Sequence, residues 1–262
     1  MKLQINPAMQ GVQWVKLGIG TFFKQPLALS GLFFIAFVAL IVVGALPVVG
    51  GALSLMLVPA LAVGIFLASE QASNSMFPKP SALVSALRQG KQQTKSILII
   101  GTAYFCSFWA VLGLSALIDD GALVKLLWEG ARVNELPSIL ANTQLQYALL
   151  LFIAFNAPLL LIFSNASALV HRHQLTPGKS IFFSAVTVVK NYRALAVFAT
   201  AWIGVSVAIS FAISLLTVIA GNSKELFVTL VFSSSLLWYA MIVTSMYFTF
   251  RDCFEATPGE PQ

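Results

Sequence analysis

The stretch Leu27–Leu46, LALSGLFFIAFVALIVVGAL, contains no charged residue. A helix needs about 20 mostly apolar residues to cross a hydrocarbon core about 30 Å thick, so this stretch is long enough to span a membrane. Further uncharged apolar stretches follow it: Gly51–Ala68, Ile97–Ile118, Tyr147–Val170, Ala194–Ala220 and Leu226–Phe250. They lack the period-two alternation of polar and apolar residues that is typical of a membrane β-barrel. We therefore predict an all-α, polytopic membrane helix bundle with six transmembrane helices.

The composition of the chain agrees with that class. Of its 262 residues, 58% are hydrophobic and 9% are charged, whereas about 25% are charged in a typical soluble domain. The mean hydropathy is +0.89. So few charged side chains cannot cover the core of a soluble fold, and the composition also excludes a disordered chain and a disulfide scaffold. We expect a single membrane domain over residues 1–262 that ends in a short disordered tail, 255–262.

Basic residues are distributed unequally between the loops, and this predicts the orientation. The two ends and alternate loops hold Lys2, Lys16, Lys24, Lys79, Arg88, Lys91, Lys95, Arg172, Lys179, Lys190, Arg193 and Arg251. The loops of the other side hold only Lys125, Arg132 and Lys224. Because loops rich in lysine and arginine stay in the cytoplasm, we predict that both termini are cytoplasmic. This rule explains the net charge of +6 without a nucleic-acid partner.

A short amphipathic segment, a span, a loop and a second span follow one another three times. The amphipathic segments are Gly11–Lys24, Ser81–Lys95 and Gly178–Arg193, and the pseudo-repeats cover about residues 9–79, 80–176 and 177–254. Polar and apolar residues recur in each segment with the period of a helix that lies on the membrane surface, here the cytoplasmic one. The alternative is that the segments are linkers whose basic residues only set the topology.

Basic residues of these segments are candidate contacts for anionic lipid. A surface helix buries its apolar face, which in the first segment includes Val15 and Phe22, among acyl chains. It offers its basic residues to negatively charged headgroups. The candidate contacts are Lys16, Lys24, Arg88, Lys91, Lys95, Lys190 and Arg193, and those from Arg88 to Lys95 form one basic stripe.

The spans lack the combinations of residues that catalysis requires. Ser115 belongs to a Gly-x-Ser sequence and is predicted near the outer edge of the membrane, whereas the chain's histidines, His171 and His173, are predicted at the cytoplasmic edge. No general base is therefore expected at the depth of this serine. The histidines have no neighbouring cysteine or acid that would complete a metal site. We expect no enzyme activity, no cofactor and no bound metal.

Amides and hydroxyls are the remaining polar groups inside the spans. Asn156, Ser164 and Asn165 lie in the fourth span, and Ser234 lies in the sixth. Such groups commonly form hydrogen bonds between helices. Alternatively they line a polar path through the bundle, which would make the protein a small transporter or channel.

Several short sequences along the chain are recognisable: GVQWVK at Gly11–Lys16, FFKQP at Phe22–Pro26, GLSAL at Gly113–Leu117, Ala157-Pro158, and YFTFRDCF at Tyr247–Phe254. Together they resemble a family of uncharacterised multi-pass inner-membrane proteins spread mainly through the proteobacteria. The resemblance extends over nearly the whole chain and implies location and architecture, but no activity. We expect a non-enzymatic membrane protein that interacts with anionic lipid or organises an unidentified membrane protein partner.

Overall fold

Helices form every regular element that the structure describes. The computed structural model describes residues 3–88, 90–130, 141–221 and 223–254, so the expected tail lies outside the described residues. Six of the described helices are long and apolar enough to cross a membrane: α2 (Pro26–Gly44), α3 (Gly50–Ser73), α4 (Lys91–Asp119), α7 (Thr143–His173), α9 (Tyr192–Ile219) and α10 (Lys224–Phe254). The shortest, α2, has 19 residues, and at about 1.5 Å per residue it matches the thickness of the hydrocarbon core. The prediction of an all-α protein with apolar helices at six places is confirmed.

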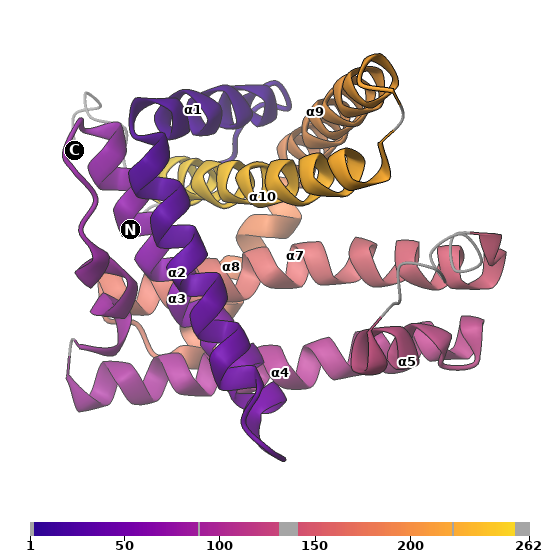
Figure 1. Ribbon diagram of the computed structural model, residues 1–262. Helices are drawn as coiled ribbons and strands as arrows, with labels where there is room; N and C mark the ends of the chain where they lie inside the picture. The colour runs from indigo at the N-terminus through magenta and orange to yellow at the C-terminus, as the bar shows by residue number, and fades with distance from the viewer. Residues whose placement is uncertain (1–2, 89, 131–140, 222, 255–262) are drawn as a thin grey trace.

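The long helices form hairpins that meet at α3. Helix α2 pairs with α3, α4 pairs with α7, and α9 pairs with α10, while α3 also packs against α4, α7 and α10. A short helix, α5 (Ala122–Glu129), follows α4 and packs against α4 and α7. In Figure 1, α4, α7 and α10 run in similar directions across the view, whereas α2 and α9 cross them at an angle. The hairpins therefore splay away from a shared region around α3.

Most of the buried core lies in the C-terminal halves of three long helices. Buried residues predominate in Pro59–Ala72 of α3, Leu161–Val170 of α7 and Ala240–Phe254 of α10. The N-terminal halves of α7 and α10 instead expose large apolar side chains, such as Phe155 at 54% and Phe232 at 60%. Extensive exposed apolar surface is typical of a protein face that contacts a membrane.

Helix α1 (Gln10–Lys24) packs along α10 and α9, and Figure 1 shows it beside α10. Trp14 is 0% exposed, Val15 is 5% exposed and Phe22 is 2% exposed. The expectation that Val15 and Phe22 lie among acyl chains is therefore wrong, because protein covers this face of α1. Apolar helices in a membrane associate through van der Waals contact, and these large side chains supply that contact with neighbouring helices.

The second amphipathic segment, Ser81–Lys95, consists of two elements. Residues Pro80–Leu87 form the 3-10 helix η1, which packs on α3, and α4 begins only at Lys91. Between them Gly90 has a φ of +113°, a conformation that ends a helix and that glycine adopts without strain. The prediction of one continuous surface helix is wrong here. Lys91 and Lys95 instead belong to the first turns of a long apolar helix.

Helix α8 (Pro177–Lys190) has a polar face and an apolar face, and the polar face is turned toward protein. Ser180 and Ser184 are both 0% exposed, and Ser184 Oγ donates a hydrogen bond of 2.8 Å to the carbonyl of Ile162 in α7. On the other face Phe182 is 62% exposed. Small hydroxyl side chains let helices approach closely and bond to backbone carbonyls, which explains why this face meets α7.

Candidate functional site

A hollow with three basic side chains lies at the start of α4. It has a volume of about 600 Å³ and is lined by Leu87, Arg88, Gly90, Lys91, Thr94, Lys95, Leu98, Ile99 and Thr102. The helical spacing of four residues aligns Lys91, Lys95 and Ile99 on one side of α4. The turn at Gly90 lets the chain bring Arg88 next to them. This site, called the basic hollow below, therefore joins three cations to an apolar wall.

The cations of the basic hollow have no acidic partner. Arg88, Lys91 and Lys95 are exposed, and none of them forms an ion pair within the described ranges. The arginine of α7 differs from them, because Arg172 pairs with Glu70 of α3 and its guanidinium lies over an aromatic ring of α10. The positive charge of the basic hollow is thus available to an external anion.

A second hollow adjoins the first, between the start of α4 and the connection from α7 to α8. It has a volume of about 470 Å³ and is lined by Gly90, Lys91, Gln92, Gln93, Ser96, Val170, Gln174, Leu175, Thr176 and Pro177. Gly90 and Lys91 line both hollows. Apart from Lys91, the polar side chains of this amide hollow are carboxamides and hydroxyls, and neither set of lining residues contains an acid.

The other predicted lipid contacts are spread over three helices. Lys16 lies on the exposed side of α1, and Lys190 is the exposed last residue of α8. Lys24 Nζ donates to a backbone carbonyl at the end of α3 at 2.9 Å. Arg193 lies in the first turn of α9, where its Nε donates to the neighbouring tyrosine hydroxyl at 3.0 Å. None of these four lines the basic hollow, so the structure brings together only three of the predicted contacts.

The residues of the predicted polar path lie in two separate regions. Ser234 lines a hollow of about 220 Å³ between α9 and α10, and neither Asn156 nor Asn165 lines that hollow. Asn156 Nδ2 donates to a carbonyl of its own helix at 3.2 Å. Ser164 and Asn165 are buried in α7, at 0% and 2% exposed, and Ser164 Oγ and Asn165 Oδ1 have no hydrogen-bond partner among the described residues. That these groups line a polar path stays a prediction.

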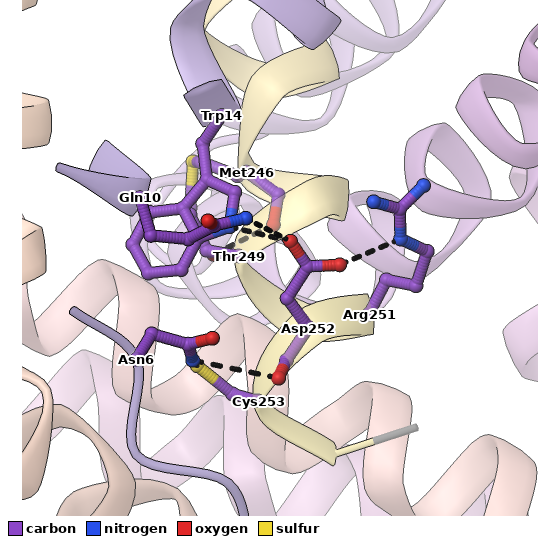
Figure 2. A network of polar contacts seen from close by, with 8 residues as sticks. All are labelled: Asn6, Gln10, Trp14, Met246, Thr249, Arg251, Asp252 and Cys253. Carbon is purple, nitrogen blue, oxygen red and sulfur yellow. Dashed lines mark hydrogen bonds and ion pairs between the residues drawn. The ribbon is translucent and has the colours of Figure 1, made fainter. Parts of the chain in front are cut away.

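A polar network that the sequence did not indicate joins the first and last helices. Figure 2 shows the carboxylate of Asp252, near the end of α10, facing Gln10 and Trp14 of α1. Gln10 Nε2 donates to Asp252 Oδ2 at 2.8 Å, and Trp14 Nε1 donates to the same oxygen at 2.9 Å. Arg251 Nε pairs with Asp252 Oδ1 at 2.7 Å. Both carboxylate oxygens therefore have partners, as a charge beside a buried core requires.

Asn191 extends this network to the junction between α8 and α9. It is 1% exposed, and its Oδ1 accepts a hydrogen bond of 2.8 Å from the backbone N–H of Asn6. Its Nδ2 donates to the carbonyl of Gln4 at 3.1 Å, and the N–H of Gln4 donates to the carbonyl of Cys253 at 3.1 Å. Figure 2 shows Asn6 next to Cys253. These contacts join residues far apart in sequence, so no local pattern indicated them.

No arrangement for metal binding occurs in the part of the chain that the structure describes. There, no group of three or more histidine, cysteine and acidic side chains could hold a metal ion. Ser115 Oγ donates to the carbonyl of Leu112 in its own helix at 2.8 Å. Cys106 and Cys253 are free cysteines. The basic hollow is thus the candidate site that the geometry supports best.

Six long apolar helices that pack against one another define a multi-pass membrane protein. The chain is 32% identical to a protein of Burkholderia thailandensis that is named a probable inner membrane protein, over 264 aligned residues that cover 100% of this chain and 97% of the relative. It therefore belongs to the family of that probable inner membrane protein, and the resemblance seen in the sequence is confirmed. No family model matches the chain, and no solved structure matches it.

Proposed function

We propose that the protein is a non-enzymatic membrane protein that binds anionic phospholipid on the cytoplasmic side through Arg88, Lys91 and Lys95. The observation that supports this proposal is the basic hollow itself. Its three unpaired cations adjoin Leu98 and Ile99 of α4, which are 38% and 46% exposed. When the phosphate of a phospholipid contacts the cations, the acyl chains of that lipid lie beside this apolar wall. The same site could present bound lipid to a membrane protein partner.

Replacing both Lys91 and Lys95 by glutamine is expected to weaken the binding of phosphatidylmethanol, a lipid with one negative charge, about 30-fold. A basic residue near an anionic headgroup contributes about 1 kcal/mol, and 1.4 kcal/mol corresponds to a factor of ten. Native mass spectrometry of the full chain in detergent with added lipid measures the binding. The matched control, Lys125→Gln with Lys224→Gln, removes the same charge from α5 and α10 and should bind normally. Equal binding by the two double variants would contradict the proposal.

We also propose that both termini lie in the cytoplasm. The unequal distribution of basic residues supports this orientation. The hydrogen bond between Gln4 and Cys253 further supports a common side for the two ends. A reporter enzyme that works only in the cytoplasm should be active when fused to either end and inactive when fused after Gly221, between α9 and α10. Activity of a periplasmic reporter at either end is the opposite outcome and would rule out this orientation.

We infer in addition that the chain consists of three related units, each with one short element followed by two long helices. The contacts that support this form a closed cycle: η1 packs on α3, α8 packs on α7, and α1 packs on α10. The short element of each unit thus rests on the second long helix of the preceding unit, and the first unit closes on the third. An experimental structure in which the three units fail to superpose would contradict this inference.

A small transporter or channel is the second candidate. The observation in its favour is that Ser164 Oγ, Asn165 Oδ1 and Ser167 Oγ are buried in α7 without hydrogen-bond partners in the described part of the chain, which is costly unless another group satisfies them. Asn165→Cys, in a chain whose native cysteines are replaced by alanine, tests this candidate. Reaction with a membrane-impermeant thiol reagent supports a water-filled path to α7. Protection of the thiol in the folded protein, with full reaction after denaturation, argues against one.

A further inference from the structure

The geometry points to one chemical class of lipid for the site: we propose that it selects a phosphodiester lipid whose headgroup is an uncharged polyol, such as phosphatidylglycerol. This inference rests on the proposed function and deepens it. The phosphate binds in the basic hollow, and the headgroup hydroxyls bind in the adjoining amide hollow.

The two hollows are continuous with each other. Gly90 and Lys91 line both, so a phosphate at Lys91 has the basic hollow on one side and the amide hollow on the other. The side chains of Gln92, Gln93 and Thr176 then lie within the hollow that a headgroup beyond the phosphate would enter. Carboxamides offer both donors and acceptors, and a polyol needs both.

The charge of the two hollows disfavours a cationic headgroup. Arg88, Lys91 and Lys95 repel an ammonium group, and no aspartate or glutamate lines either hollow to pair with one. A phosphatidylethanolamine headgroup would therefore hold its ammonium near like charges without a counter-ion, which disfavours binding. An uncharged headgroup meets no such repulsion.

The apolar wall of the basic hollow distinguishes a lipid from a soluble phosphate. Leu98 and Ile99 continue the basic hollow down α4 toward the exposed apolar part of that helix. A water-soluble glycerol phosphate has no apolar part to bury against this wall, whereas the acyl chains of a lipid pack against it. The occupant is therefore a membrane lipid.

The test compares phosphatidylglycerol with phosphatidylmethanol, which has the same single charge but no headgroup hydroxyl. The full chain in detergent is titrated with each lipid and with phosphatidylethanolamine, and binding is followed by native mass spectrometry. Phosphatidylglycerol is expected to bind about tenfold more tightly than phosphatidylmethanol, since two or three net hydrogen bonds are gained. Phosphatidylethanolamine is expected to bind more weakly than both, and sn-glycerol 3-phosphate is expected not to displace bound lipid.

The variant Gln92→Ala with Gln93→Ala should lower the affinity for phosphatidylglycerol to that for phosphatidylmethanol and leave the latter unchanged. The matched control, Gln13→Ala with Gln144→Ala, changes exposed glutamines of α1 and α7 and should keep the preference. Equal affinity of the native chain for the two lipids would overturn the headgroup assignment while the proposed function stands. Displacement by sn-glycerol 3-phosphate would overturn the lipid assignment. If neither anionic lipid binds better than phosphatidylcholine, the proposed function itself fails.

Discussion

Replacing Gly101 by valine is expected to lower the free energy of unfolding by about 3 kcal/mol, the cost of overpacking a site that cannot relax. Gly101 lies in α4 where this helix meets α3. A Cβ atom at this position would lie 2.1 Å from the carbonyl oxygen of Met56. The obstacle is backbone, so no rotation of a side chain relieves the clash, and the two helices must separate. Because α3 joins the hairpins, the separation should disturb the whole bundle.

Gly113→Val is the matched control, since it makes the same change in the same helix. A Cβ atom at Gly113 meets no atom within 4 Å, so this variant should unfold at the temperature of the native chain. Thermal unfolding of the purified proteins in one detergent measures both. If the two variants were equally stable, the close approach of α3 and α4 at Gly101 would be refuted.

Removal of the Asp252 carboxylate has the second large expected effect. Asp252→Ala should lower the free energy of unfolding by about 3 kcal/mol, because the indole N–H of Trp14 and the amide of Gln10 lose their acceptor. Leaving one buried donor unsatisfied costs about 1–3 kcal/mol. The loss should concentrate where α1 meets α10, so amide hydrogen exchange in α1 should increase with the loss of thermal stability.

A double-mutant cycle tests whether the hydrogen bond carries this effect. Trp14→Phe keeps an aromatic ring and removes the donor, so it should cost less in the Asp252→Ala background than in the native chain. Glu225→Ala removes a carboxylate from the exposed start of the same helix, α10, and should change neither stability nor exchange. Strict additivity of the Trp14 and Asp252 changes would show that the contact contributes nothing.

The apolar spans could be predicted because the transfer of a helix into lipid depends on the summed hydrophobicity of a local window. The ends of the helices were less predictable. The sequence places the end of the second span at Ala68, whereas α3 continues to Ser73, past the charged Glu70. Glu70 is accommodated because it pairs with Arg172 of α7. A partner 102 residues away cannot be seen in a local window.

In the amphipathic segments, too, a local pattern predicted only part of the structure. Residue spacing separates the polar from the apolar side chains of α8, but it did not indicate that Ser184 would face α7 while Phe182 faced outward. A periodic pattern specifies which side chains share a face. It does not specify whether protein, lipid or water covers that face.

The candidate site depends both on residue spacing in the sequence and on tertiary structure. The spacing of Lys91 and Lys95 indicated that they share a side of a helix, and the sequence also identified Arg88 as a neighbour. The break at Gly90 and the adjoining hollow under the α7–α8 connection became visible only in the tertiary structure.

By itself, then, the sequence determined the membrane class, the number of apolar helices and the uneven distribution of positive charge, because these are sums over neighbouring residues. The tertiary structure decided which helix faces meet, which charges are paired and where a hollow forms. Those properties depend on residues that are distant in the chain and become neighbours only after folding.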